Sequence, residues 1–332
     1  ATEAGDRVGM MGDDGEKFGS WPTTWEHCWG PTRWIDRFFE ALEANAGWLT
    51  TVTPSAWLEA NPPIGRVYLP TASYAEMGEW ALPPADSRVF ADLLHRAEAT
   101  DAPEYRFLRG GFWRNFQVKY REINDLHKQM LRTSAKVAAM LDGPAKTAAL
   151  DHLYQGQSND CYWHGLFGGI YISHMRLATY EHLIAAEDAA DRAARAAGRP
   201  ADPVQVEDVD LDGVPEIVLA AEGQLVAVKP SEGGGIGSWD VRAVRHALAA
   251  VMRRRPEASH ETLVAHERRL AEQRGAQPAE SGGVGSIHDR VSVKEPGLAG
   301  RLHYDTYERR SGLVHLFAPG TTPGTFAQAD AV

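Results

Sequence analysis

The pattern of apolar and polar residues divides the chain into regions of different character. In the first 70 residues, three short apolar runs each lead into a turn or loop, which is typical of buried strands: residues 7–11, 49–53 and 66–69. A helix is expected over residues 33–45, capped by Thr32 and stopped by Gly47. A second helical turn is expected to start at Pro54. This alternation of strand, loop and helix predicts the second half of a β/α barrel.

The remainder of the chain changes from helical to strand-like at a polar linker. Helical patterns cover residues 121–150 and 169–197. The linker GRPADP, residues 198–203, marks an expected domain boundary. Three β-branched segments follow, separated by turn residues: 204–209, 216–221 and 224–228. Their spacing predicts a β-sandwich.

Composition excludes several classes of function. The formal net charge is −11 and the pI is about 5.6, unlike the basic surface of a nucleic-acid-binding protein. Two cysteines, Cys28 and Cys161, do not suggest a disulfide framework, so a cytoplasmic location is expected. No run approaches the ~18 apolar residues of a membrane span, and no signal peptide is recognised. We therefore expect neither a nucleic-acid partner nor a membrane association.

The run GDDGEKFG at residues 12–19 concentrates three carboxylates in four residues: Asp13, Asp14 and Glu16. It follows a predicted strand, and Trp21 lies just beyond it. Barrel enzymes carry their catalytic groups on such loops. Crowded carboxylates are expected to raise one another's pKa, as a proton donor at neutral pH requires. The alternative is a solvated Asp/Gly turn.

The run QSNDCYWHG at residues 157–165 combines amide, carboxylate, aromatic and imidazole side chains. Amides and carboxylates bind adjacent sugar hydroxyls, and an indole covers the apolar face of a pyranose ring. The candidate sugar ligands are Asn159, Asp160, Trp163 and His164. Alternatively, Asn159 or Asp160 caps a helix and the aromatic residues are core. A metal site on Asp160 and His164 would have only two ligands, so no metal or cofactor is predicted.

Two further stretches are rich in aromatic residues. Tyr74, Met77 and Trp80 either line a groove or form the buried face of a short helix, and for Met77 the buried position is favoured. The cluster at residues 110–116 (GGFWRNF) is expected to be core rather than a binding subsite.

The run DVDLDG at residues 208–213, with Glu216 after it, resembles the opening of a calcium loop. The remaining ligand positions of an EF-hand do not follow. The pattern favours a solvated turn between two strands, with calcium as the alternative.

Several of these runs, taken in order, resemble glycoside hydrolase family 57, which contains 4-α-glucanotransferases and related α-amylases. The matching runs are DDGEKFG, LPTASYAEMGEW, GGFWRNFQVKY, SNDCYWHGLFGGIY, DVDLDGVPEIVL and GGGIGSWD. The resemblance covers nearly the whole chain. It implies an α/β plus β fold: a partial (β/α)7 barrel with a helical region, followed by an incomplete β-sandwich. The regions would be residues 1–118, 119–198 and 199–332.

The resemblance also implies an activity on α-1,4-glucans or maltooligosaccharides by a retaining mechanism, in which two carboxylates lie about 5–5.5 Å apart. Asp14 corresponds to the acid/base. Substrate contacts are implied for the other members of the two motifs: Asp13, Glu16, Trp21, Asn159, Asp160, Trp163 and His164. The family's nucleophile is a glutamate on an earlier strand than the DDGEKFG loop, and only thirteen residues precede Asp14.

We therefore expect a piece of a longer protein, cut at both ends, that is inactive by itself. Transfer between glucans is favoured, and a homodimer is compatible with the resemblance. The alternatives are an α-amylase-type hydrolase, a non-catalytic glucan-binding fragment, and a metal-dependent hydrolase built on Asp13, Asp14, Asp160 and His164.

Overall fold

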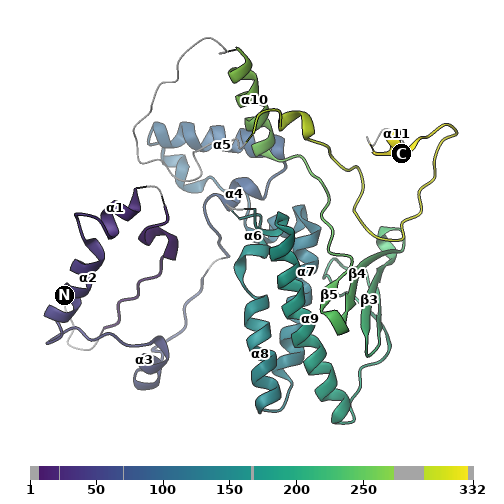
Figure 1. Cartoon of the computed structure of the whole chain (residues 1–332). Helices are drawn as coiled ribbons and strands as arrows, with labels where there is room; N and C mark the ends of the chain where they lie inside the picture. Colours follow the sequence, from purple (N-terminus) through teal and green to yellow (C-terminus); the bar gives the residue numbers. More distant parts are fainter. Residues whose placement is uncertain (1–6, 22, 70, 166–167, 273–294, 328–332) are drawn as a thin grey trace. The chain divides into compact units, whose positions relative to one another are not determined.

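The computed structural model describes residues 7–21, 23–69, 71–165, 168–272 and 295–327 (Figure 1). The contacts divide the chain into two compact units. The first comprises residues 1–70 and 268–294, and the second comprises residues 71–267 and 295–332. The domain limits expected from the sequence remain a prediction.

The first unit contains short helices joined by irregular segments: η1 (Gly15–Phe18), α1 (Thr24–Cys28), α2 (Trp34–Ala44) and α3 (Pro54–Ala60). The prediction of α2 is confirmed within a residue at each end, but its cap is Arg33, in the left-handed region at φ 43°. Thr32, the expected cap, donates its hydroxyl to the carbonyls of Glu26 and His27. In α3, Thr53 accepts a hydrogen bond from Ala56 N as the N-cap.

The three apolar runs predicted as strands form no strand in the described part of the chain. Their side chains are exposed instead, with Met10 and Tyr68 each 86% accessible. A strand forms only where its backbone N–H and C=O groups pair with a neighbouring segment. Within the residues that the structure describes, these runs meet no such segment. The strands of the predicted barrel are therefore not observed.

The second unit is built around helices that lie side by side (Figure 1). They are α6 (Trp113–Lys119), α7 (Arg121–Ala138), α8 (Pro144–Gly156) and α9 (Ser173–Ala196), preceded by α4 (Met77–Trp80), α5 (Pro84–Ala99) and η2 (Pro103–Phe107). The helical run predicted at 121–150 is split because Gly143, at φ 154°, and Pro144 interrupt it. Gly198, at φ 69°, ends α9, as its place in the linker suggested.

One antiparallel sheet follows, with its strands in sequence order. The strands are β1 (Val204–Glu207), β2 (Glu216–Ala220), β3 (Gln224–Lys229), β4 (Gly235–Val241) and β5 (His246–Ala247). The first three are confirmed from the sequence pattern. A bulge between Ala227 and Val228 shifts the register of β3 against β4. After the sheet come α10 (Ala258–Glu272) and α11 (Pro323–Ala327).

No second sheet is present among the described residues, so the predicted sandwich is not observed. Helices α7 and α9 contact the sheet instead: α9 lies against β5, and α7 presents polar side chains to β3 and β4. Asp240 on β4 accepts a hydrogen bond from Gln129 Nε2 at 2.7 Å. Lys229 Nζ on β3 lies 2.7 Å from Asp125 Oδ1 on α7. Buried Asp240 and Lys229 need polar partners, and the helix supplies them. This explains why a helix covers this face of the sheet.

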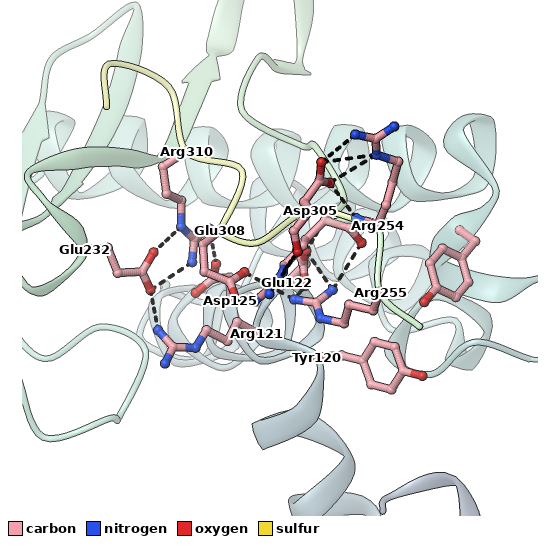
Figure 2. A network of polar contacts seen from close by, with 12 residues as sticks. Tyr120, Arg121, Glu122, Asp125, Glu232, Arg254, Arg255, Asp305, Glu308 and Arg310 are labelled. Atoms are coloured by element: carbon pink, nitrogen blue, oxygen red, sulfur yellow. Dashed lines mark hydrogen bonds and ion pairs between the residues drawn. The ribbon is translucent and has the colours of Figure 1, made fainter. Parts of the chain in front are cut away.

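The segment after α10 is tied to α7 and to the end of the sheet by ion pairs (Figure 2). Arg310 binds Asp125 at 2.8 Å and also pairs with Glu232. Glu308 and Glu122 both bind Arg255, at 3.2 and 2.8 Å. This network fixes residues 305–310 against the first turns of α7.

The main apolar core is formed by α4 and α6–α9, with Phe116, Tyr120, Ile123 and Leu126 fully buried. Cys28 and Cys161 are both buried, and neither forms a disulfide. Among the described residues, no helix is both long and apolar enough to cross a membrane.

Candidate functional site

A cavity of about 630 Å³ opens in the second unit, between α4, α6, α7 and η3 (Asn159–Tyr162). Most of its lining side chains are aromatic, sulfur-containing or uncharged polar. They are Ser73, Tyr74, Met77, Trp113, His127, Met130, Gln157, Asn159, Tyr162 and Trp163. Concave sites of this size, largely apolar with a few placed polar groups, are the usual form of a small-molecule site.

Trp163 is the centre of the aromatic wall. Its ring stacks with Tyr74 at a centroid distance of 6.2 Å and an interplanar angle of 18°. Trp80 lies on another side of it, at 5.6 Å. Together with Trp113 and Tyr162, these rings give the cavity an aromatic lining, and aromatic side chains pack well against the apolar C–H face of a pyranose.

Gly169 fixes the backbone that carries Trp163. It lies in η4 (Gly169–Tyr171) at φ 46°, and a Cβ added there would lie 2.4 Å from the carbonyl oxygen of Trp163. The next residue, Ile170, donates its N–H to that same oxygen at 3.0 Å. Only glycine allows this close approach together with a positive φ. The GG pair in the sequence run is therefore part of the site's framework.

Trp113 packs against the apolar core, as expected, and it also lines the cavity. Its Nε1 donates to the carbonyl of Tyr162 at 2.8 Å, and its backbone N–H donates to Ser73 Oγ at 2.9 Å. These bonds join three distant segments and turn the indole toward the cavity. Because the partners are 49 and 40 residues away, local sequence could not reveal this placement.

His127 and Met130 on α7 are further lining residues that the sequence did not single out. The His127 ring packs edge-on against Trp113 at 4.8 Å. Burial, with a smaller effect from Lys128, lowers the pKa of His127 to about 4. The imidazole is therefore neutral near pH 7 and can exchange hydrogen bonds with a neutral ligand.

The predicted sugar ligands of the 157–165 run have different surroundings. Asn159 and Trp163 line the cavity. Asp160 is exposed and accepts a hydrogen bond from Ser158 Oγ at 3.1 Å. His164 packs among aromatic rings, 4.9 Å from Trp80 and 5.2 Å from Phe116. No third histidine, cysteine, aspartate or glutamate ligand joins Asp160 and His164 among the described residues of this unit.

The predicted catalytic turn lies in the first unit. Asp14 precedes η1, and its backbone N–H donates to Asp13 Oδ1 at 2.9 Å. Asp14 and Glu16 are both exposed. Lys17 Nζ lies 2.6 Å from Asp13 Oδ1 and 5.3 Å from the centre of the Trp21 ring. Lys17 therefore links Asp13 to Trp21, while Asp14 and Glu16 are accessible beside them in the chain.

One electrostatic expectation for this turn was wrong. Crowding was expected to raise the carboxylate pKa values, but the hydrogen bond from Lys17 and the backbone N–H of Asp14 lower the pKa of Asp13. The pKa of Asp13 falls because η1 brings the ammonium group of Lys17, four residues later, into contact with the Asp13 carboxylate. Lys17 therefore favours the ionised form of Asp13 and holds it within the turn.

Known proteins match this chain along most of its length. Two family models match: the alpha-amylase/4-alpha-glucanotransferase middle domain at residues 111–190, and the C-terminal domain of the same name at residues 208–332. An alpha-amylase 1 of Dictyoglomus thermophilum is 34% identical, over 96% of this chain and 44% of that protein. A 4-alpha-glucanotransferase of Thermococcus litoralis is 35% identical, over 95% of this chain and 44% of that protein.

A crystal structure of the Thermococcus litoralis 4-alpha-glucanotransferase matches with a TM-score of 0.64 and 32% identity, over 96% of this chain and 43% of that one. The chain therefore spans less than half the length of these relatives. It belongs to the alpha-amylase/4-alpha-glucanotransferase family, and the resemblance stated from its sequence motifs is confirmed.

Proposed function

We propose that this protein acts on α-1,4-glucans as a 4-α-glucanotransferase, in which the 630 Å³ cavity binds glucose units and Asp14 is the proton donor. The observation that carries the proposal is the aromatic wall of Trp163 and Tyr74 with the Asn159 amide beside it. Relatives named 4-alpha-glucanotransferase and alpha-amylase support this choice of substrate class.

The cavity suits a neutral polyhydroxyl ligand. Its lining has stacked rings for the apolar faces of glucose, and the side chains of Asn159, Gln157 and neutral His127 can exchange hydrogen bonds with hydroxyls. Among its lining residues, none carries a full charge near neutral pH. A neutral sugar therefore needs no ionic partner there, whereas a charged ligand would remain uncompensated.

In the proposed retaining reaction, Asp14 protonates the departing 4-hydroxyl while a second carboxylate takes the glucosyl group as an ester. Asp14 then acts as base toward the 4-hydroxyl of an acceptor glucan, which receives the sugar. The family resemblance assigns none of the 332 residues as that second carboxylate. We therefore expect this chain alone to bind maltooligosaccharides without converting them.

We also propose that the first unit forms part of a (β/α)7 barrel and that the protein is cytoplasmic. The apolar runs 7–11, 49–53 and 66–69 have exposed side chains and pair with no strand in the described part of the chain, as expected of segments that would pair into a (β/α)7 barrel with further strands. The two free cysteines agree with a reducing compartment.

The test joins residues 1–332 to the part of the Thermococcus litoralis enzyme that lies outside the match, and follows maltoheptaose by chromatography. We expect both longer and shorter maltooligosaccharides. Asp14→Asn should lower the rate by on the order of 10²–10⁴, the usual contribution of general acid catalysis. Asp36→Asn, which removes an exposed carboxylate on α2, should leave the rate unchanged.

The alternative reaction, hydrolysis, has its own result in the same assay. Shorter products without longer ones would identify an α-amylase-type hydrolase, because water and not a sugar would then accept the glucosyl group. Full activity in the Asp14→Asn protein would refute the assignment of the acid.

A further inference from the structure

The loop that joins β1 to β2 is rich in carboxylates at alternating positions. Asp208, Asp210 and Asp212 are followed by Gly213, and Glu216 begins β2. Counting Asp208 as the first position, the acidic residues occupy positions one, three, five and nine, and the glycine is at position six. A calcium loop of the EF-hand type uses side chains at one, three, five and nine, with glycine at six for a sharp turn, and a glutamate at twelve, where this chain has Leu219. Gly213 has φ 94°, as such a turn requires.

The fold brings these side chains together. One carboxylate oxygen each from Asp208, Asp210 and Glu216 lies within 4.8 Å of the other two. Backbone N–H groups shape the loop around them: Asp212 N donates to Asp208 Oδ1 at 3.0 Å, and Gly213 N donates to Asp208 Oδ2 at 2.9 Å. Oxygens from distant points of the loop therefore face one small volume.

Glu216 provides an observation that is independent of the loop geometry. Its side chain is 0% exposed, and its Oε2 accepts the backbone N–H of Val209 at 2.9 Å. Its Oε1 is buried and has no hydrogen-bond partner in the described part of the chain. A carboxylate oxygen removed from water without a partner is costly, and a cation bound between it and the neighbouring carboxylates would remove that cost.

The nearby basic side chains do not supply that cation. Lys229 binds Asp210 but also binds Asp125, and Arg310 is shared between Asp125 and Glu232. Among the residues that the structure describes, no lysine, arginine or histidine forms an ion pair with Asp208, Asp212 or Glu216. Three carboxylates of the loop thus lack a positive partner.

We propose that the β1–β2 loop is a calcium site, formed by the carboxylates of Asp208, Asp210, Asp212 and Glu216. All four donors are hard oxygens, which favours Ca²⁺ or Mg²⁺ over zinc or copper. Asp208, Asp210 and Glu216 already place oxygens within 4.8 Å of one another, Asp212 is the fourth candidate from the sequence pattern, and Ca²⁺ accepts six to eight oxygens at variable angles, whereas Mg²⁺ demands a near-ideal octahedron. Asp210 and Asp212 also line a cavity of about 740 Å³, which gives an ion a path to the loop.

The bound ion would hold the sheet to the helices. Asn124 on α7 donates its side-chain N–H to the carbonyl of Asp210 at 2.7 Å. Three residues further along the same helix, His127 lines the glucan cavity. Calcium is therefore expected to stabilise the second unit, and this role does not depend on whether the cavity binds a glucan.

The test is calcium titration of the whole chain, freed of metal with a chelator, by calorimetry and by thermal unfolding. We expect saturable binding of one Ca²⁺ and a rise in the unfolding temperature. Glu216→Gln and Asp208→Asn should each weaken binding by about tenfold or more, since affinity follows the number of charged ligands. Glu222→Gln removes an exposed carboxylate from the β2–β3 turn and should bind as the parent does.

Thermal unfolding without calcium distinguishes a variant that has lost a calcium ligand from one that has lost its fold. In chelator, Glu216→Gln should unfold at or above the parent's temperature, because it removes an uncompensated buried charge. No binding by the parent at millimolar Ca²⁺, equal binding by the parent and both variants, or an equal shift with Mg²⁺ would each overturn the calcium site.

Discussion

Asp240 on β4 offers a sharp test of the electrostatics between the sheet and the helices. Its side chain is almost fully buried, and its Oδ2 accepts a hydrogen bond from Gln129. Its Oδ1 has no partner among the described residues. Burial, helped by the nearby charge of Glu187, raises the pKa of Asp240 to about 7 from the ordinary 3.8. We predict that Asp240→Asn stabilises the protein at alkaline pH.

The sign and size follow from proton linkage. Because the folded state keeps this proton to a higher pH than the unfolded chain does, the stability contributed by Asp240 falls as pH rises from about 4 to about 7. A pKa difference between 3.8 and about 7 corresponds to about 4 kcal/mol when the group is fully ionised. The asparagine places an unpaired N–H where Oδ1 was, at a cost of about 1–3 kcal/mol. The net gain expected at pH 8 is therefore about 1–3 kcal/mol.

The assay is urea unfolding at 25 °C for the parent and Asp240→Asn between pH 5 and pH 8. The difference between their free energies of unfolding should grow by about 3 kcal/mol in favour of the variant over this range, and then level off. Asp305→Asn is a control of opposite sign. Arg254 and Arg309 hold the pKa of Asp305 low although burial opposes them, so its removal should destabilise at pH 8. A difference for Asp240→Asn that does not change with pH would refute the reasoning.

Two further changes test the packing of the second unit. Gly169→Ala should lower the free energy of unfolding by about 2–3 kcal/mol, because its Cβ would meet the Trp163 carbonyl at 2.4 Å in a left-handed conformation. Thermal unfolding measures the loss, with Gly223→Ala as the control because its added methyl group has open space. Equal unfolding temperatures for the two variants would contradict the predicted clash at Gly169. Glu257→Ala should cost about 2–3 kcal/mol by removing the acceptor of two tyrosine hydroxyls, each at 2.6 Å. Glu257→Gln, which keeps an acceptor, should cost less in urea unfolding, and an equal loss would count against this bond network.

The sequence pattern predicted the helices and strands that are determined by residues close together in the chain. Strands β1–β3 follow from β-branched residues between turns, and α2 follows from its apolar spacing. The split between α7 and α8 could also have been predicted, because Gly143 and Pro144 are strong helix breakers. Strand β4 contains two glycines and lacks a clear alternation, so its pairing with β3 is decided by the neighbouring strand.

Features that depend on distant partners were not predictable. The runs at 7–11, 49–53 and 66–69 have the composition of strands, but a strand needs a second segment to bond with. Trp113 has the composition of a core residue, and only its bonds to Ser73 and Tyr162 turn it toward the cavity. In the candidate catalytic turn, Lys17 was visible in the sequence at four residues from Asp13, and that spacing was the signal for the lowered pKa of Asp13.

The central claim, that the aromatic cavity binds an α-1,4-glucan, is tested most directly by calorimetric titration of the whole chain with maltoheptaose. We predict saturable binding in the parent and a loss of at least about tenfold, or 1.4 kcal/mol, in Trp163→Ala. Trp48→Ala removes an indole that is 78% exposed in the first unit and should bind as the parent does. Absence of binding by the parent, or equal affinity in Trp163→Ala and the parent, would contradict the account.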